Sequence, residues 1–431
     1  MTYKDNWLKK EEKIKKNNKK RHYLHFDCKI SYKRLLTYLE NPLNIEKHSF
    51  FPFIKDILKN KRYKLNSVTK ERVMDLKERE IFYSSHVDTL IYSWYQCILE
   101  ENYEKFIQKE SYNSSIIAYR KIDGKCNIDF AFEVFEFIRV YGECTALAFD
   151  ITNFFPTLNH MILLKNYKKI IENQILPNDH YKVFKSLTSF AYVEKEKLKH
   201  YYKGKRKKRL CEINEYRNNV RGLIEVNGNK YGIPQGSALS ALLSNIYMLE
   251  FDKKVYNEVQ KLGGLYRRYS DDIIVICPTQ NSLFIKELIY TLIQDEVKLS
   301  INENKTDITN FRFENLQLKA FNSENKLKYV QYLGFEFDGM CIRLRSSSIS
   351  KYYRRLKKRV SSVNRRTWKK KTLGKTLGIK KLYENNTHLG KRNFIKYAYR
   401  SAQIMNSEII KKQVKNHWKI LHSQLTNRKR I

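Results

Sequence analysis

The chain has 431 residues, enough for two or three structural units, and positive charge dominates its composition. It contains 84 Lys and Arg against 45 Asp and Glu, a formal net charge of +39 at pH 7. This excess predicts a polyanionic partner, and nucleic acid is favoured over a membrane because no apolar run approaches the ~20 residues of a spanning helix. The start of the sequence lacks the apolar core of a signal peptide, so we expect a cytoplasmic protein with no membrane partner.

The N-terminal part contains a polar segment followed by an aromatic one. Residues 1–22 form a charge run that we expect to be disordered. Residues 23–110 are rich in aromatic side chains with helical periodicity, which predicts a helical N-terminal extension. The seven cysteines are scattered without a CxxC pair, so neither a disulfide framework nor a zinc site is indicated.

Strand-like runs dominate the middle of the chain. They occupy residues 145–155, 223–234 with an Asn-Gly turn, 264–277, and 328–344 with an Asp-Gly turn. Strands joined by hairpins and mixed with helices indicate an α+β fold. A lysine-rich insertion at 195–217 interrupts these runs, and we expect it to be an exposed loop or a basic arm.

The C-terminal part is intensely basic. From residue 345 to the end, 26 Lys and Arg face only Glu384 and Glu408, a net charge of +24. With so few acids to pair with, these cations favour phosphate contact over a merely solvated surface.

This basic part is also predicted to be helical. In residues 347–366 apolar side chains recur at helical spacing, and the basic side chains lie mostly off that stripe. A glycine-containing link at 369–381 precedes a second expected helix over residues 391–425.

Three aspartates are candidates for chemistry. Asp271 and Asp272 lie between two apolar runs that can form antiparallel strands, with Asp271 at the turn; alone this is weak evidence, because Asp is common in turns. Asp150 follows the apolar run TALAF, and a charge in a buried strand needs a cation. If the two segments are neighbouring strands, these acids can converge on hard divalent ions. Two Mg²⁺ ions ~3.5–4 Å apart are a general solution for displacement at phosphorus, so we predict phosphoryl or nucleotidyl transfer.

Several segments resemble, in order and spacing, the motifs of bacterial reverse transcriptases. They are FDITNFF (149–155), YGIPQGSALSALLSNIY (231–247), RYSDDIIVI (268–276), LSINENKTDI (299–308) and YLGF (332–335), together with the fingers-like AYRK (118–121). The resemblance implies a right-hand polymerase of the α+β class with an antiparallel palm sheet. It implies an N-terminal extension over residues 1–75, fingers and palm over 76–345, and a helical thumb over 346–431.

The same resemblance implies an RNA-directed DNA polymerase and assigns its site residues. Asp150, Asp271 and Asp272 are the implied catalytic residues, and two Mg²⁺ ions are implied at Asp150, Ile151, Asp271 and Asp272. The implied nucleotide-binding residues are Arg120, Lys121, Phe155, Gln235, Gly236 and Lys305. The implied primer- and template-binding residues are Tyr332, Leu333, Gly334, Arg354, Arg355 and Lys358.

Two of these residues have roles with a clear physical basis. Phe155 resembles a steric gate that leaves no space for a 2′-hydroxyl, and Lys305 resembles the lysine assigned to protonating the leaving group. Plainer alternatives stay open, since Phe155 and Leu333 could be core residues and Arg120 and Lys121 could be ordinary surface cations.

The flanking segments resemble a narrower group. Residues 21–31, 48–58, 77–95 and 393–405 are similar to the stand-alone bacterial "unknown group" reverse transcriptases associated with antiphage defence. This implies a dedicated non-coding RNA as template, dNTPs as substrates and DNA as product, with a homo-oligomer or a partner protein left open. Three alternatives also stay open: a retron-type reverse transcriptase, untemplated or protein-primed DNA synthesis, and a non-catalytic RNA-binding scaffold.

Overall fold

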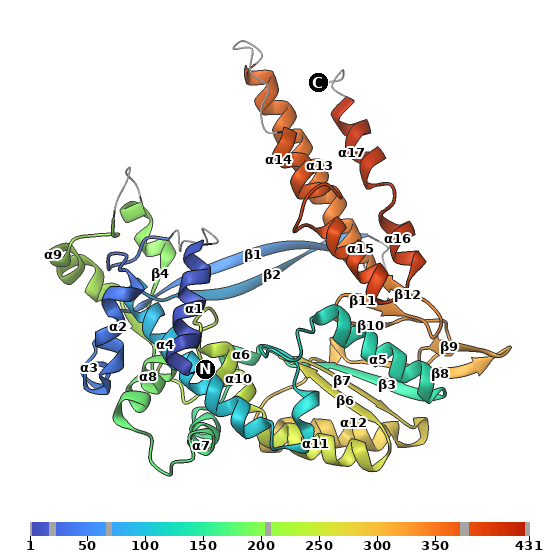
Figure 1. The fold of residues 1–431 in the computed structure, drawn as a ribbon, viewed down its shortest axis with the longest axis horizontal. Coiled ribbons are helices and arrows are strands. Elements are labelled where there is room, and N and C mark those ends of the chain that lie inside the picture. Colours follow the sequence, from blue (N-terminus) through green and yellow to red (C-terminus); the bar gives the residue numbers. More distant parts are fainter. Residues whose placement is uncertain (1, 17–22, 66–70, 203–207, 371–378, 427–431) are drawn as a thin grey trace.

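A five-stranded antiparallel sheet with the order β6-β7-β3-β8-β9 forms the centre of the molecule (Figure 1). The structure is a computed structural model that describes residues 2–16, 23–65, 71–202, 208–370 and 379–426. The strands are β3 (Cys144–Asp150), β6 (Leu265–Tyr269), β7 (Asp272–Cys277), β8 (Asp307–Glu314) and β9 (Gln317–Phe321). Together with the helices around it, this sheet confirms the predicted α+β class.

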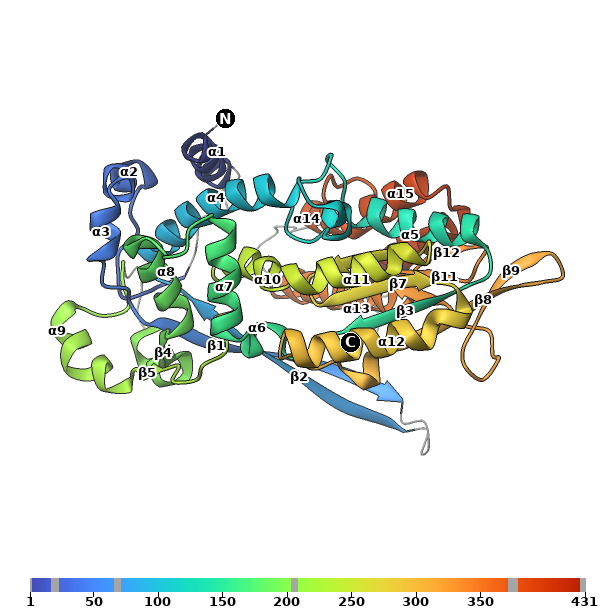
Figure 2. The same ribbon diagram turned by 90° about the horizontal axis from the view of Figure 1, so that it is seen from below.

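Both faces of the central sheet are covered, which explains the unbroken apolar runs of its strands. Leu147 and Phe149 of β3 belong to a core shared with α11 (Leu249–Lys261) and α12 (Ser282–Thr291), the helices in front of the sheet in Figure 2. Ala146 alternates to the other face, which is covered by α5 and a small second sheet. These covering elements are α5 (Asn127–Tyr141), β10 (Val330–Tyr332), β11 (Phe335–Phe337) and β12 (Ile342–Leu344).

The described part of the N-terminal segment, residues 2–16, is ordered, in contrast to our expectation for residues 1–22. Residues 3–16 form helix α1 (Tyr3–Lys16), and Trp7 is completely buried with its ring 5.2 Å from that of Trp94 in an edge-to-face contact. Aromatic burial of this kind outweighs the polar character of the segment, because one Trp removes a large apolar area from water. Residues 17–22 lie outside the described residues.

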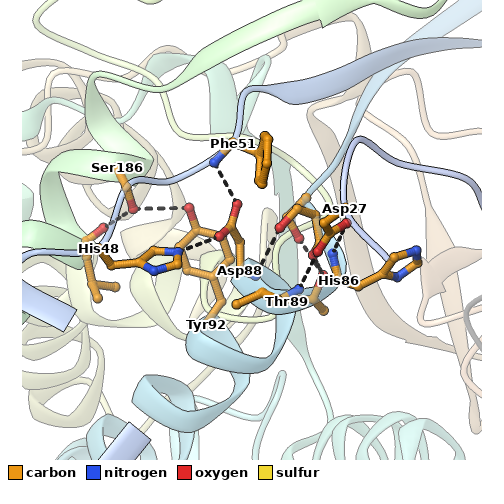
Figure 3. Close-up of polar contacts among 12 residues, drawn as sticks. Asp27, His48, Phe51, His86, Asp88, Thr89, Tyr92 and Ser186 are labelled. Carbon is orange, nitrogen blue, oxygen red and sulfur yellow. Dashed lines mark hydrogen bonds and ion pairs between the residues drawn. The ribbon is translucent and has the colours of Figure 1, made fainter. Parts of the chain in front are cut away.

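Polar contacts fix the extension to the start of α4 (His86–Ile107), as Figure 3 shows. Asp27 accepts hydrogen bonds from the backbone N–H groups of His86 at 3.0 Å and Val87 at 2.9 Å, the exposed donors of a helix N-terminus. Asp88 lies 2.9 Å from His48 Nε2 and accepts a 3.0 Å bond from Phe51 N. Burial raises the pKa of the Asp88 carboxyl, and these partners oppose that shift.

A long hairpin interrupts the predicted helical extension. Strands β1 (Phe53–Leu65) and β2 (Arg72–Tyr83) pair over their whole length, and β1 also pairs with β4 (Ala191–Glu194). The expected boundary after residue 75 therefore falls inside β2. The predicted Asn-Gly hairpin within 223–234 is wrong as well, because β5 (Glu225–Val226) pairs with β4.

The lysine-rich insertion at 195–217 is not a simple exposed loop. It begins with the 3₁₀ helix η2 (Lys195–Tyr202), and Leu198, Tyr201, Leu210 and Cys211 are buried in a core cluster with Phe26 and Ile54. Hydrophobic side chains spaced among the lysines therefore fold the segment against the extension, while residues 203–207 lie outside the described part.

The basic C-terminal part begins with the predicted helix, α13 (Ser346–Lys370), whose residues Tyr352, Leu356 and Val360 are buried. The prediction of a single helix over 391–425 is wrong. The helix is interrupted at Asn406, which adopts a left-handed φ of 45°. The helices there are α14 (Ile379–Asn386), α15 (Phe394–Ile404), α16 (Glu408–Val414) and α17 (His417–Thr426).

The remaining helices lie between the extension and the central sheet or within the extension itself. They are α2 (Tyr32–Glu40), α3 (Pro42–Glu46), α6 (Phe154–Thr157), α7 (His160–Ile170), α8 (Asn178–Thr188), α9 (Ile213–Glu215) and α10 (Ser240–Tyr247). Across the described ranges, no helix combines the length and the apolar character that crossing a membrane requires.

Candidate active site

Asp150 and Asp272 face each other across two neighbouring strands. β3 and β7 pair antiparallel, with Asp150 opposite Asp272 at the end of the ladder. Side chains alternate between the faces of a strand, so Asp150 shares its face with Ala146 and Ala148, and Asp272 shares the same face with Ile274. We expected these acids to converge if their segments were neighbouring strands, and the pairing of β3 with β7 confirms that they are.

Asp271 lies in the tight turn that joins β6 to β7. Ser270 has a φ of 62°, a left-handed conformation that is uncommon for a residue other than glycine, and Asp271 follows it in the turn. The carbonyl oxygen of Asp271 accepts a 3.2 Å hydrogen bond from Ile151 N, so the turn is tied to the end of β3. The predicted hairpin with Ser270 and Asp271 at its turn is confirmed.

Like charges gather where these segments meet. Crowding of its carboxyl by protein atoms raises the pKa of Asp272 to about 6, and repulsion from Asp271 and Asp150 adds to the rise, although Asp272 as a residue is exposed. Lys305 and Arg345 act in the opposite direction. The Lys305 ammonium forms an ion pair with Asp150 Oδ2 and supplies the nearest positive charge.

The donor set of this site suits a hard divalent cation, because carboxylate oxygens are the ligands that such ions prefer. Within the described residues, however, no three His, Cys, Asp or Glu side chains are gathered as a ready metal cluster. Asp150 is instead paired with Lys305, and Asp272 is repelled by both Asp271 and Asp150. The residues therefore fit a cation by their chemistry, with Lys305 holding a positive charge beside Asp150.

A buried ion pair that we did not predict from the sequence supports the turn. Arg268 and Asp252 are both completely buried, with Arg268 Nε 2.7 Å and Nη2 2.6 Å from the two carboxylate oxygens. The same guanidinium donates at 3.2 Å to Asn245 Oδ1 and at 3.2 Å to the carbonyl oxygen of Ser270. This network holds the backbone of the acid-bearing turn. In the sequence, the position of Arg268 two residues before Ser270 is the only sign of this network.

The GIPQGS segment meets the base of the β1–β2 hairpin. Phe82 N donates a 2.9 Å hydrogen bond to the carbonyl oxygen of Gln235. Gly236 has a φ of +130°, and a Cβ on it would lie 2.5 Å from Phe82 O, so no other residue fits without displacing backbone. Phe155, half-buried on α6, accepts a 3.0 Å bond from Ile233 N at its carbonyl oxygen, so the predicted gate lies beside this segment.

Arg120 is committed to other protein groups rather than to a triphosphate site. Its guanidinium donates to both carboxylate oxygens of Glu104 at 2.8 Å, to Asn113, and to the carbonyl oxygen of Ile116, and its side chain is 3% exposed. The apolar segment before it forms no strand, and its Ile116 takes part in an isolated bridge with Arg268. Lys121, in contrast, is 88% exposed and lies 3.5 Å from Glu100.

The YLGF segment forms the turn between β10 and β11, with Leu333 and Gly334 at its corner. Tyr332 is buried, and its hydroxyl forms no hydrogen bond within the described residues. Burial raises the pKa of its phenol, Arg267 opposes the shift, and Asp272 reinforces it, which places Tyr332 near the acid-bearing hairpin. Arg354, Arg355 and Lys358 are exposed on α13, which begins directly after this small sheet (Figure 1).

Two further residues near the acids were missed by sequence reasoning. The Tyr119 hydroxyl lies 3.1 Å from Ser270 Oγ, and Tyr119 has a φ of 62°. Arg345, just before α13, lies close enough to lower the pKa of Asp272. Neither carries a local signal, because each is brought to the site by packing of distant segments.

Comparison with known proteins places the chain in a family. Residues 90–337, which are 248 of the 431 residues, match the family model described as reverse transcriptase (RNA-dependent DNA polymerase). The telomerase reverse transcriptase of Mus musculus is 36% identical over 85 residues, which cover 19% of this chain and 7% of the mouse protein. The chain thus corresponds to a small fraction of that relative.

Solved telomerase structures show a more distant likeness. Apo telomerase from Candida tropicalis, truncated from the C-terminal domain, is 11% identical with a TM-score of 0.43, over 67% of this chain and 57% of that chain. Telomerase from Candida albicans in complex with a fragment of telomeric RNA is 12% identical with a TM-score of 0.40, over 92% of this chain and 68% of that chain. Both TM-scores are below 0.5.

The family match contains the central sheet, the GIPQGS segment and the hairpin that carries Asp271 and Asp272. The elements around them follow the right-hand arrangement that the sequence predicted, with the antiparallel sheet as palm and the basic helices after β12 as thumb. Because the match spans more than half of the chain, the protein belongs to the reverse transcriptase family of RNA-dependent DNA polymerases.

Proposed function

We propose that this protein synthesises DNA on an RNA template by nucleotidyl transfer at Asp150, Asp271 and Asp272. The observation that carries the proposal is the pairing of β3 with β7, which sets Asp150 opposite Asp272 beside the turn that holds Asp271. Burial, followed by repulsion from Asp271 and Asp150, raises the pKa of Asp272, and bound divalent cations would relieve that repulsion.

Each remaining residue has a proposed task. Mg²⁺ ions held by the three carboxylates and Ile151 would neutralise charge that develops on the reacting phosphate. Lys305 Nζ, which is now paired with Asp150, donates a proton to the leaving pyrophosphate. Phe155 excludes the 2′-hydroxyl of a ribonucleotide, and Gln235 with Gly236 lines the nucleotide pocket.

The cations around the site divide into two groups. Lys121 is exposed and contacts the triphosphate. Arg120 does not, because its N–H donors are engaged by Glu104, Asn113 and Ile116. Arg354, Arg355 and Lys358 on α13 hold the template and primer backbone, and the YLGF turn supports the primer end near Asp272.

The biological setting that we propose is antiphage defence in a bacterium, with the cytoplasm as the expected location and a dedicated non-coding RNA as the template. The flanking segments support this narrower assignment, among them residues 77–95, which end β2 and begin α4. We also propose that Mg²⁺ is the divalent ion that the three carboxylates bind.

The decisive test removes the paired acids. Purified protein carrying Asp271→Ala with Asp272→Ala is expected to lose dNTP incorporation on a primed RNA template by at least about 10³-fold, as removal of charge-stabilising groups does elsewhere. Asp295 and Glu296 form a second adjacent acidic pair, exposed on the surface, so Asp295→Ala with Glu296→Ala is the matched control and should retain activity. Full incorporation by the first variant would show that the site is misassigned.

A second experiment separates the alternatives for the product. Sequencing the DNA made by the protein together with its co-purified RNA should give DNA complementary to that RNA. DNA without a complement in the RNA would support untemplated or protein-primed synthesis, and RNA without any DNA would support a non-catalytic scaffold.

A further inference from the structure

The thumb contains a basic pocket that shares only Arg355 with the residues of the proposed function. Its volume is about 340 Å³, and it lies between α13 and the segment that joins α14 to α15. Four of its lining side chains are cationic, namely Lys351, Arg355, Arg359 and Arg392, and none of the described lining residues is acidic. Lys351, Arg355 and Arg359 are four residues apart, which puts them on one side of α13.

These cations lack acidic partners. Among the described residues, no Asp or Glu forms an ion pair with Lys351, Arg355 or Arg392, and Arg359 donates to the neutral Asn386 Oδ1 at 2.7 Å. Four like charges around one pocket repel each other, although their exposure lets water and salt screen part of that repulsion, and a bound anion would relieve it. The charge pattern therefore indicates a ligand with several negative charges close together.

The wall opposite α13 is held in a fixed position. Tyr352, which is buried on α13, donates a 2.5 Å hydrogen bond to the carbonyl oxygen of Asn386. Asn393 donates at 2.8 Å to Glu384 O and at 2.6 Å to Thr387 O, which closes the loop on itself. A Cβ on Gly390 would lie 1.6 Å from Glu384 O, so the loop packs too closely for any other residue. A cavity with fixed walls binds with less ordering cost than a flexible charged surface.

Aromatic surface accompanies the charge. The rings of Tyr352 and Phe394 stack with centroids 5.0 Å apart, and Phe394 remains partly exposed at the pocket. An exposed ring beside cations is the combination that binds a base next to its phosphates.

We propose that this pocket binds the phosphorylated 5′ end of a nucleotide or of an RNA strand, with its terminal phosphates among the four cations. A phosphodiester in the backbone carries one charge and is usually held on an open surface, whereas a terminal triphosphate concentrates several charges at one point. Arginine guanidinium groups also match phosphate oxygens in a two-pronged geometry, and three of the four cations are arginines. This inference goes beyond the proposed polymerase activity and does not depend on it.

The test measures binding of one RNA sequence that carries a 5′-triphosphate, a 5′-monophosphate or a 5′-hydroxyl to the full-length protein, by fluorescence anisotropy at one salt concentration. The unmodified protein should bind the triphosphate RNA about tenfold or more tightly than the hydroxyl RNA, the order expected for charge-assisted hydrogen bonds. Arg392→Ala and Lys351→Ala should each remove most of that preference while leaving binding of the hydroxyl RNA nearly unchanged.

Matched controls come from neighbouring positions. Lys391 and Lys357 are exposed and do not line the pocket, so Lys391→Ala and Lys357→Ala should preserve the preference for the triphosphate. Thermal unfolding verifies that each variant is folded. The unmodified protein tests the proposal without any variant, because equal affinities for the triphosphate and hydroxyl RNAs would overturn it. A pocket variant that loses the same affinity for all three RNAs would also overturn it.

Competition distinguishes the two sources of the ligand. Displacement of the triphosphate RNA by ATP as well as by inorganic triphosphate would indicate a pocket for free nucleotides. Displacement by a second triphosphate RNA at concentrations where ATP fails would indicate the end of an RNA strand. Failure of all three competitors to displace the labelled RNA would contradict the pocket.

Discussion

At the residue scale, the acids of the site depend on buried partners as much as on each other. Arg268 and Asp252 are fully buried and hold the carbonyl oxygen of Ser270, the residue that precedes Asp271. A buried charge is tolerated only while its partner is present. The geometry of the acid-bearing turn is therefore linked to the stability of this ion pair.

Removing one member of the pair should be costly. We expect Arg268→Ala to lower the free energy of unfolding by about 3–5 kcal/mol, because it leaves the Asp252 carboxylate buried without its cation. Denaturant titration measures this change. The exposed pair of Lys411 and Glu408 provides the control, since Lys411→Ala should cost less than about 1 kcal/mol. Similar effects for the two variants would contradict the role given to burial.

The choice between deoxynucleotides and ribonucleotides should depend on one ring. We expect Phe155→Val to raise the use of ribonucleotides relative to deoxynucleotides by about tenfold or more, because a smaller side chain leaves space for the 2′-hydroxyl. Single-nucleotide incorporation kinetics give the ratio. Phe154→Val alters the adjacent, buried ring and should lower stability without changing that ratio. An unchanged ratio in both variants would make Phe155 an ordinary core residue.

At the element scale, the site is assembled where a hairpin meets a turn. The base of β2 bonds to Gln235 through Phe82 N, so the position of the nucleotide segment depends on a strand more than 150 residues earlier in the chain. Gly236 permits this contact because any Cβ would collide with Phe82 O.

Filling that contact should impair nucleotide binding. Gly236→Ala combines a φ of +130° with a clash against backbone, so we expect a cost of about 1–3 kcal/mol and a higher KM for dNTPs. Steady-state incorporation kinetics and thermal unfolding measure the two effects. Gly228→Ala is the control, because a Cβ there meets nothing within 4 Å. Equal KM values for the two variants would argue against the docking of β2 on this segment.

At the scale of the whole molecule, positive charge is concentrated in the thumb, whose first helix, α13, follows the small sheet (Figure 1). Of the 84 Lys and Arg, 26 lie from residue 345 onward. Cations that neutralise phosphates release counterions, so binding of RNA should weaken as the salt concentration rises.

This dependence can be measured residue by residue. The logarithm of the RNA association constant should fall linearly with the logarithm of salt concentration, and Arg354→Ala with Lys358→Ala should reduce the slope by about 1–2. Lys29→Ala with Lys33→Ala changes the same charge at exposed positions in the extension, near α2, and should leave the slope unchanged. An unaltered slope in the thumb variant would remove those residues from the RNA-binding surface.

The sequence by itself determined the central hairpin, the strand that ends in Asp150, the α+β class and the amphipathic α13, because each depends on local alternation or periodicity. It also indicated the family through short motifs in a fixed order. It did not predict α1, the β1–β2 hairpin or the folded insertion, where a few buried aromatic or aliphatic residues decide the structure of a largely polar segment.

Only the tertiary structure decided which charged side chains face each other. Arg120 and Lys121 are adjacent in sequence, yet one is enclosed by Glu104 and Asn113 while the other is exposed. Arg268 is one of many basic residues in the sequence, and its packing against Asp252 distinguishes it. Charge partners are set by distances between segments far apart in the chain, and burial then determines whether a charge serves the fold or a ligand.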